Sequence, residues 1–447
     1  MSESAIRCSM KPRNSSVQYF LCGAICLCAL LTTSVLGQEN NSANATAPPK
    51  KSLTPEERHE RSLAKQAKEN EAKRTRLQTF GVIPEDDQSP LAQAYRKAMQ
   101  DFRVSTSEFA EIHSRMQYRL DKNVDDSQRY RWLEKLSSNY SKLVAFRNAA
   151  SDLVLSDPAR YETVALMLRD MLITEVPADR SDHWARGARA VLCCEQLITD
   201  DVLLHAGYAG FIEADWDLAT TAWAKLAERG KLPEVEQQML KTIPEMQAHW
   251  EQELERRKED EGKNNPRVEF LTSKGAIEIE LFEDDAPESV ASFIYLVENG
   301  YYNRKLFYLV RRHFITQTGC EKGDGKGTAG YTIRFEGDAP TFRRHFRGSL
   351  AIPLGIDADT QDVNPKSGGA QFYIAFSPLP IFDGKHTVFG RVVKNIEFLG
   401  LLKEVNLTDE EQRKDPHLHP DRIISAKVLR KRDHDYRPTP LMGKLPN

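Results

Sequence analysis

The feature of this sequence that most constrains its fold is a change in hydrophobic period at Pro266. From about residue 88 up to that proline, apolar residues recur three or four positions apart, as they do on one face of an α-helix. After it, residues 268–272 and 277–281 alternate between apolar and polar side chains, which is typical of an antiparallel hairpin with one buried face. The sequence therefore predicts an α-helical part followed by a β-rich part.

The length and composition of the chain agree with more than one domain. A chain of 447 residues is longer than one ordinary domain, and its 40% hydrophobic residues suffice for more than one core. Its net charge of −3 gives no general attraction for nucleic acid, so we expect no nucleic-acid partner. Seven cysteines are too few for a fold built on disulfides. No second cysteine pair stands at ligand spacing, so we expect no metal site.

The N-terminal segment, residues 1–37, is typical of an export signal. Arg7, Lys11 and Arg13 supply positive charge, and the uncharged apolar run that follows ends in small residues that permit cleavage after Gly37. The same run is long enough to serve as an uncleaved membrane anchor, so both interpretations stay open. We expect an exported protein, in the periplasm, in the cell envelope or secreted, that contacts a membrane only if the segment is uncleaved.

The next two segments differ in composition. Residues 38–87 are polar, contain prolines and are rich in charges, which predicts a disordered or charged linker. Residues 88–263 carry the helical period and predict an α-helical domain. Within it, residues 201–230 weakly resemble a tetratricopeptide helix pair, with Gly207 and Trp223 at positions where two helices touch. A partner protein of this helical domain is a further expectation.

The β-rich part contains one clear helix. The stretch DAPESVASFIYLVENG predicts a helix that begins near Pro287 and stops at Gly300. Strand and turn patterns continue from there to about residue 432, and residues 433–447 are expected to form a tail. Taken alone, this pattern predicts a closed β-barrel with a helical lid.

Five stretches of the β-rich part resemble, in the same order, the cyclophilin family of peptidyl-prolyl cis-trans isomerases. They are TSKGAIEIELFEDDAPESVASFIYLVENGYY, HFITQTGCEKGDGKGTAGYTI, FRRHFRGSLAIP, SGGAQFYIAF and PIFDGKHTVFGRVV. The resemblance covers about residues 267–432, within a predicted domain of residues 264–432. It implies an eight-stranded closed antiparallel barrel capped by two helices, with an outer groove for X-Pro peptides and no cofactor.

The same resemblance assigns roles to single residues. Phe314 would form the floor of a pocket for the proline ring, and Gln317 would hydrogen-bond the substrate carbonyl, so both are predicted catalytic residues. The predicted substrate-binding residues are Ile315, Pro353, Gln371, Tyr373, Phe382 and His386.

Several positions depart from the family pattern, and three of them bear on the predicted chemistry. Phe307-Tyr308-Leu309 stands where the family has Phe-His-Arg, and that arginine donates to the prolyl nitrogen. Leu309 offers neither a donor nor a charge. Tyr373 adds a hydroxyl where the family usually has phenylalanine, and Pro353 removes a backbone donor or redirects the peptide-binding loop.

Other arginines of the β-rich part have two expected roles. Arg311 follows Leu309 by two positions and faces the same way along a strand, about 7 Å away. It is therefore a further candidate catalytic residue, as a substitute donor, and a solvated arginine is the alternative. We expect Arg343, Arg344 and Arg347, in FRRHFRG, to form ion pairs at the surface.

These inferences lead to two functions. Rotation about a prolyl bond has a barrier of about 18–20 kcal/mol because the bond has partial double-bond character. A dry pocket and a donor aimed at the prolyl nitrogen stabilise the twisted amide. The sequence predicts an isomerase for X-Pro bonds of exported proteins, with activity weakened at Leu309. The alternative is a non-catalytic module that binds prolyl peptides and is recruited through the helical domain.

Overall fold

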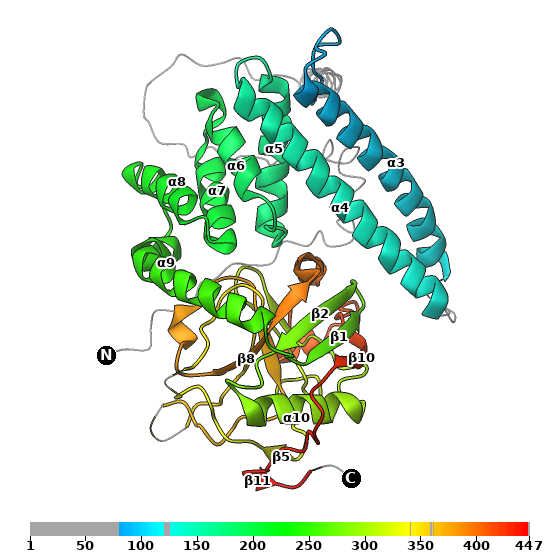
Figure 1. Ribbon diagram of the computed structural model, residues 1–447, viewed down its shortest axis with the longest axis vertical. Helices are drawn as coiled ribbons and strands as arrows, with labels where there is room; N and C mark the ends of the chain where they lie inside the picture. The colour runs from blue at the N-terminus through cyan, green and yellow to red at the C-terminus, as the bar shows by residue number, and fades with distance from the viewer. Residues whose placement is uncertain (1–79, 120–125, 340, 358–359, 361, 446–447) are drawn as a thin grey trace, which may run out of the picture. The chain divides into compact units, whose positions relative to one another are not determined.

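The computed structural model describes residues 80–119, 126–339, 341–357, 360 and 362–445. The predicted export segment and the predicted linker up to residue 79 lie outside these residues. The chain divides into two compact units, of which one contains Gln93–Phe146 and the other contains Ile83–Ala92 and Arg147–Asn447. The later helices and all of the strands therefore belong to one unit (Figure 1). We also predict that residues 267–432 fold independently.

The first unit is built on most of two long helices, α3 (Pro90–Arg119) and α4 (Asp126–Ser156); the first three residues of α3 and the residues of α4 from Arg147 belong to the second unit. The Ser89 hydroxyl accepts a hydrogen bond from the backbone N–H of Ala92 at 3.2 Å and so caps the start of α3. Within the unit, the ring of Phe146 lies 5.6 Å from that of Tyr95 and 5.7 Å from that of Phe102, between ring centroids. These aromatic contacts join the two helices.

Five helices precede the strands in the second unit. They are α5 (Glu162–Glu175), α6 (Ala185–Leu192), α7 (Asp200–Glu213), α8 (Trp216–Glu228) and α9 (Glu234–Glu261). Polar caps fix where α7 and α8 begin, because Thr199 accepts from the backbone N–H of Val202 and Asp215 accepts from that of Leu218. The helix pair predicted over residues 201–230 is thus present, and its membership of a repeat family stays a prediction.

Helices α7 and α8 touch at Gly207. The indole Nε1 of Trp223 donates a hydrogen bond to the Leu204 carbonyl at 3.1 Å, across the two helices. A β-carbon added at Gly207 would lie 2.0 Å from that same nitrogen. Glycine at this position therefore leaves the space that the buried indole occupies.

Gly207→Ala is expected to lower the free energy of unfolding of the second unit by about 2 kcal/mol, because overpacking a tight contact typically costs about 1–3 kcal/mol. Gly262→Ala is the control, since the nearest atom to its added β-carbon is the Glu259 carbonyl oxygen at 3.6 Å. Urea unfolding followed by tryptophan fluorescence measures both. Equal losses in the two variants would show that the helix contact tolerates a methyl group.

The strands form one nine-stranded antiparallel sheet in the order β10-β1-β2-β8-β6-β7-β4-β3-β9. Their bounds are β1 (Arg267–Thr272), β2 (Ala276–Leu281), β3 (Leu309–Arg311), β4 (Ile315–Thr318), β6 (Ser349–Ile352), β7 (Phe372–Ala375), β8 (Thr387–Lys394), β9 (Val405–Asn406) and β10 (Ile423–Arg430). An antiparallel bridge pairs Leu306, just before β3, with Arg422, just before β10. The sheet therefore curls far enough for segments near its two ends to pair.

The predicted fold class is confirmed, and two details differ. The sheet has nine strands where eight were expected, because the two-residue strand β9 pairs with the outer side of β3. One substantial helix, α10 (Pro287–Glu298), packs on the barrel core, while α11 (Glu410–Lys414) is only five residues long. The helix predicted to begin at Pro287 is therefore present, and the second cap is small.

Strand alternation separates two apolar clusters in the barrel. On β7, Phe372 and Ile374 belong to the interior core, together with Phe293 of α10. The next residues along, Tyr373 and Ala375, belong to a second cluster. Successive side chains of a strand point to opposite faces, so the second cluster lies on the outer face of the sheet. That is the face on which the resemblance places the peptide groove.

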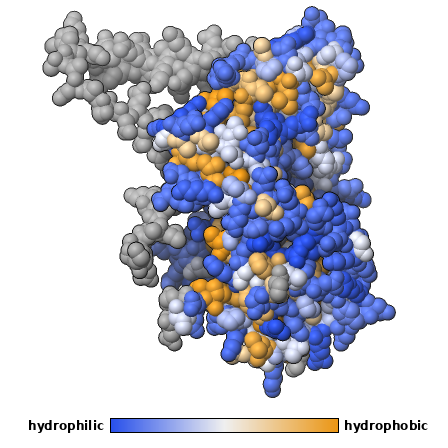
Figure 2. Space-filling view, turned by 60° about the vertical axis from the view of Figure 1, so that its left-hand side comes forward, coloured by the Kyte–Doolittle hydropathy of each residue, from blue (hydrophilic) through white to orange (hydrophobic). Residues whose placement is uncertain are grey.

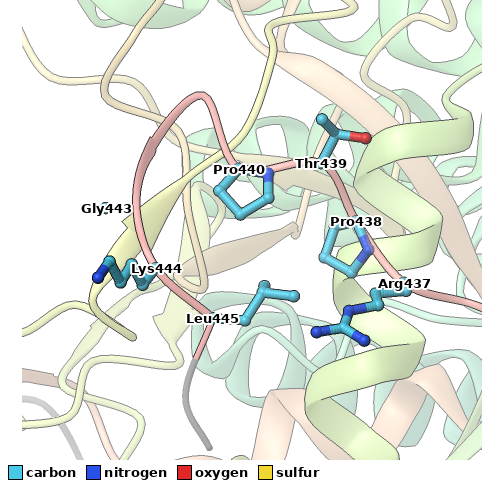
Figure 3. A pocket seen from close by; sticks show the side chains of 7 residues that line it. All are labelled: Arg437, Pro438, Thr439, Pro440, Gly443, Lys444 and Leu445. Atoms are coloured by element: carbon cyan, nitrogen blue, oxygen red, sulfur yellow. The ribbon is translucent and has the colours of Figure 1, made fainter.

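The described part of the predicted tail lies on the barrel. Strand β11 (Met442–Gly443) pairs with β5 (Tyr331–Thr332), and the Tyr436 hydroxyl donates to Glu283 at 2.5 Å. The tail also encloses a pocket lined by Arg437, Pro438, Thr439, Pro440, Gly443, Lys444 and Leu445 (Figure 3). None of these lining residues is a predicted site residue, so this pocket is distinct from the predicted groove.

Figure 2 shows one face of the molecule, on which hydrophilic side chains predominate and hydrophobic ones gather in small groups. Within the described residues, each helix is too short or too polar to cross a membrane.

Candidate functional site

The candidate groove is built on a row of residues that crosses four strands. In register, Leu309 of β3 pairs with Gln317 of β4, Gln317 pairs with Tyr373 of β7, and Tyr373 pairs with Ala351 of β6. Directly opposed residues of neighbouring strands share a face of the sheet. The leucine that replaces the expected arginine therefore lies beside the glutamine predicted to hold the substrate carbonyl.

Apolar side chains surround this row. The rings of Phe314 and Phe382 lie 5.8 Å apart, and Phe382 stacks on His386 with ring centroids 4.8 Å apart. Phe314, Phe382 and Leu309 are all partly buried against the outer cluster that contains Ile315 and Tyr373. The structure thus brings these predicted site residues together. Pro353, which directly follows β6, is not among the members of this cluster.

Gln371 links the groove to the glycine-rich loop. Its amide Nε2 donates to the carbonyls of Gly325 and Gly327 at 3.0 and 2.9 Å. Its Oε1 accepts from the Tyr308 hydroxyl, and from Gln317 Nε2 at 3.4 Å. The predicted substrate-binding residue therefore also orients Gln317. Tyr308 is a site residue that sequence reasoning treated only as a departure from the family triplet.

Arg311 lies beside the predicted pocket floor. Its side chain is exposed, and its guanidinium carbon is 5.6 Å from the centre of the Phe314 ring. That distance is within the range of a cation–π contact. A positive charge is therefore present next to the pocket, two residues along β3 from Leu309, and the role of Arg311 as a substitute donor stays a prediction.

A buried polar cluster lies behind the aromatic wall. The Tyr373 hydroxyl is 2.8 Å from His345 Nε2 and 2.9 Å from His386 Nδ1. On its other side, His345 Nδ1 is 2.8 Å from Asp383 Oδ1. Burial lowers the pKa of His386 to about 4, and the proximity of His345 and Lys385 lowers it further. Sequence reasoning missed His345 and Asp383, although both stand within the stretches that carry the family resemblance.

The helices of the second unit contact the segment that leads into the pocket floor. His313, which directly precedes Phe314, stacks on Tyr208 of α7 with ring centroids 4.5 Å apart. Next to it, Arg312 donates to the Pro177 carbonyl at 3.4 Å. Burial lowers the pKa of His313 to about 3, so the ring is neutral at ordinary pH. The helical part thus helps to place the pocket floor.

Charged groups accompany this contact. Asp179 is 1% exposed, and one of its carboxylate oxygens lies 3.7 Å from His313 Nδ1 and 3.6 Å from Arg347 Nη1. Arg347 also forms an ion pair of 2.6 Å with Asp182. Arg347 and Arg343 are both buried, so the prediction that they pair at the surface is wrong. Carboxylates of α9, of the segment between η2 (Val176–Ala178) and α6, and of the loop before α10 pair with them inside the unit instead.

Asp179→Asn is expected to make the stability of the second unit less dependent on pH. Burial raises the pKa of Asp179 to about 7, above its value in the unfolded chain. The folded state therefore binds more protons between about pH 4 and pH 7, and stability falls as pH rises through that window. Each pKa unit corresponds to about 1.4 kcal/mol, and asparagine also tolerates the positive φ of 62° at this position.

Denaturant unfolding at pH 5 and pH 8 measures the effect. The wild-type protein should lose free energy of unfolding between pH 5 and pH 8, and we expect this loss to be smaller by about 2 kcal/mol in the variant. Asp217→Asn, at an exposed carboxylate, is the control and should keep the wild-type slope. If Asp179→Asn keeps the wild-type pH dependence of stability, the Asp179 carboxyl does not bind protons differently in the folded and unfolded states.

Comparison with known proteins identifies the family of the barrel. The family described as cyclophilin type peptidyl-prolyl cis-trans isomerase/CLD matches residues 267–428. A peptidyl-prolyl cis-trans isomerase of Helicobacter pylori is 37% identical over 153 residues, which are 34% of this chain and 87% of that protein. The peptidyl-prolyl cis-trans isomerase-like 1 protein of Aspergillus fumigatus is 34% identical over 170 residues, 37% of this chain and 97% of that protein.

Solved structures of similar proteins include a cyclophilin type isomerase of Cryptosporidium parvum in the presence of the dipeptide Ala-Pro. It is 26% identical to this chain, with a TM-score of 0.30, and the match covers 36% of this chain and 98% of that one. The curated relatives match along nearly their whole length. The family match begins at residue 267, shortly after α9 ends at Glu261, and so excludes the N-terminal helices. Through residues 267–428, this chain belongs to the cyclophilin family of peptidyl-prolyl cis-trans isomerases.

Proposed function

We propose that the barrel is a peptidyl-prolyl cis-trans isomerase that acts on X-Pro bonds. The observation that carries this proposal is the row of Leu309, Gln317 and Tyr373 with the aromatic rings of Phe314 and Phe382 beside it. Two aromatic rings next to one amide side chain suit a proline ring that is joined to a peptide carbonyl. The names of the matched relatives support the same activity.

The chemistry needs only differential binding of the twisted amide. Rotation removes amide resonance, so the twisted bond is less polar than the planar one and is favoured in a dry pocket. Phe314 and Phe382 would exclude water from the proline ring, and Gln317, held by Gln371, would bind the carbonyl oxygen. Leu309 contributes no charge at the prolyl nitrogen. We therefore propose an activity weaker than that of a family member with arginine there.

A protease-coupled isomerisation assay with an X-Pro peptide tests this function on the full-length protein. We expect measurable acceleration that Phe314→Ala reduces at least about tenfold, since the pocket floor is lost. Arg229→Ala, in an exposed ion pair with Asp200, is the matched control and should keep the wild-type rate. A wild-type protein with no acceleration, or one indifferent to Phe314→Ala, would contradict the proposal.

A second candidate function is a binding module that holds X-Pro segments without isomerising them. Leu309 favours it, because the expected cation is replaced by an apolar side chain. The contact of Tyr208 with His313 also joins the helical part to the pocket floor, as a partner-recruiting module would require. Saturable binding of the peptide in the absence of acceleration would support this candidate over the isomerase.

We also propose that the clients are exported proteins. This rests on the charged and apolar pattern of residues 1–37, with cleavage after Gly37 or retention as an anchor. N-terminal sequencing of the protein from the cell-envelope and secreted fractions decides between these forms. A full-length chain recovered only from the cytosol would contradict export.

A further inference from the structure

Four side chains behind the groove form one continuous chain of hydrogen bonds. Asp383 Oδ1 is 2.8 Å from His345 Nδ1, His345 Nε2 is 2.8 Å from the Tyr373 hydroxyl, and that hydroxyl is 2.9 Å from His386 Nδ1. His345 is 0% exposed and Tyr373 is 1% exposed, whereas His386 is half-buried. Any proton that reaches His345 from the groove side must therefore pass through Tyr373.

The chemistry of the groups fixes where each proton lies in the resting chain. A carboxylate accepts only, so His345 Nδ1 carries the proton that faces Asp383, and the neutral ring presents Nε2 as an acceptor. The Tyr373 hydroxyl then donates to that nitrogen, and its oxygen accepts from the Nδ1–H of His386. This order leaves Nε2 of His386 without a proton, and across the described residues that nitrogen has no hydrogen-bond partner.

We propose that these four residues form a proton relay that decides whether His386 offers a bound peptide a hydrogen-bond acceptor or a donor. The proposal rests on the peptidyl-prolyl function proposed above, because the X-Pro peptide is the ligand that His386 would meet. It assigns to His386 the donor role that Leu309 cannot perform. Tyr373 and His345 act through His386 and are positioning residues.

The relay conserves protons at each step. One proton from solvent binds Nε2 of His386, and the proton on Nδ1 of that ring moves to the Tyr373 oxygen. The original Tyr373 proton moves to Nε2 of His345. The result is an imidazolium on His345 opposite the Asp383 carboxylate, a neutral Tyr373, and a neutral His386 that now carries its proton on Nε2. No group is oxidised or reduced.

The charges around the chain favour this end state. Asp383 faces His345 directly, whereas burial and Lys385 oppose a positive charge on His386. Burial also raises the pKa of Tyr373 well above its usual value, so the hydroxyl passes protons without ionising. Two more groups bear on Asp383. They are Arg344, whose Nη1 is 3.5 Å from Oδ2, and His249 of α9, whose pKa is lowered, chiefly by burial, although the Asp383 carboxylate acts in the opposite direction.

The test is a titration of ¹⁵N-histidine in the full-length protein by NMR, with resonances assigned from His386→Asn and His345→Gln. In the wild type we expect acidification to move the single ring proton of His386 from Nδ1 to Nε2, while His345 becomes doubly protonated. The kcat/KM for an X-Pro peptide should rise about fivefold across the same pH change, the effect of one neutral hydrogen bond.

Tyr373→Phe is the matched variant, because it removes only a hydroxyl and introduces phenylalanine, the residue that the family usually has at this position. In that variant we expect His386 to become doubly protonated on acidification, His345 to keep its tautomer, and the fivefold step to vanish. Double protonation of His386 in the wild type, or the same tautomer exchange in Tyr373→Phe, would overturn the relay. Tautomer exchange without acceleration at any pH would support the relay and contradict the isomerase function.

Discussion

Leu309→Arg is expected to raise kcat/KM for an X-Pro peptide by about ten- to hundredfold, with little change in peptide affinity. A cation at the prolyl nitrogen interacts with the lone pair that appears only in the twisted amide, so it lowers the barrier without strengthening ground-state binding. Removal of one comparable donor from an enzyme costs about 2.7–4 kcal/mol. We expect less here, because Pro353, directly after β6, has no backbone N–H to offer the peptide.

The position of residue 309 supports this expectation. It pairs with Gln317 on β4 and is only partly buried against the outer cluster, so a longer side chain can extend along the groove. The cation that it introduces would be the second one beside Phe314, after Arg311. The protease-coupled assay measures the rate, and peptide titration measures affinity.

Arg311→Ala is the control for that experiment. If Arg311 were a solvated side chain, its removal would leave the wild-type rate unchanged and would leave the gain from Leu309→Arg intact. A large loss in Arg311→Ala would show that Arg311 supplies the donor. A wild-type rate equal to that of a cyclophilin with arginine at this position, insensitive to both changes, would show that catalysis here needs no cation.

Arg343→Met is expected to lower the free energy of unfolding of the second unit by about 3 kcal/mol. Arg343 is 2% exposed and forms ion pairs with Asp260 at 2.8 Å, Asp285 at 2.7 Å and Glu253 at 3.6 Å. Removing one member of a buried ion network typically costs about 3–5 kcal/mol, because carboxylates remain without compensation. Arg391 still contacts two of them, at 3.6 and 3.7 Å, and limits the loss.

Urea unfolding of the full-length protein measures this change, and Arg229→Met is the matched control. Arg229 pairs with Asp200 at 2.9 Å, but both side chains are largely exposed, so its loss should cost less than about 1 kcal/mol. Similar midpoints for the two variants would mean that the buried network contributes no more than a surface pair.

Much of the fold and of the groove could be predicted because both depend on local patterns. Alternation at Val268 and Phe270 specified β1, and the stretch around Pro287 specified α10. Phe314, Phe382 and His386 lie together because each stands in a motif of the family. The roles of these residues in binding and catalysis stay predictions.

The parts that sequence reasoning missed depend on distant pairing. The carboxylates that form ion pairs with Arg343 come from α9 and from the loop before α10. The sequence FRRHFRG contains no pattern that predicts these partners. His345 and Asp383 likewise meet only because η4 (Pro380–Phe382) returns the chain toward residue 345. From sequence alone, a run of arginines therefore predicts a surface position, and only the folded structure shows the carboxylates with which they pair.

The carboxylates of α9 limit how this protein can be recombined with its relatives. Asp260 and Glu253 are buried, and Arg343 and Arg391 of the barrel supply ion pairs to both of them, beside Lys263 and Arg257 of their own part of the chain. A chimaera that grafts a different cyclophilin barrel onto these helices would remove the barrel's share of these ion pairs and leave two buried acidic groups with fewer partners. An exchange that keeps the barrel together with α9 is therefore expected to preserve the stability of the chimaera.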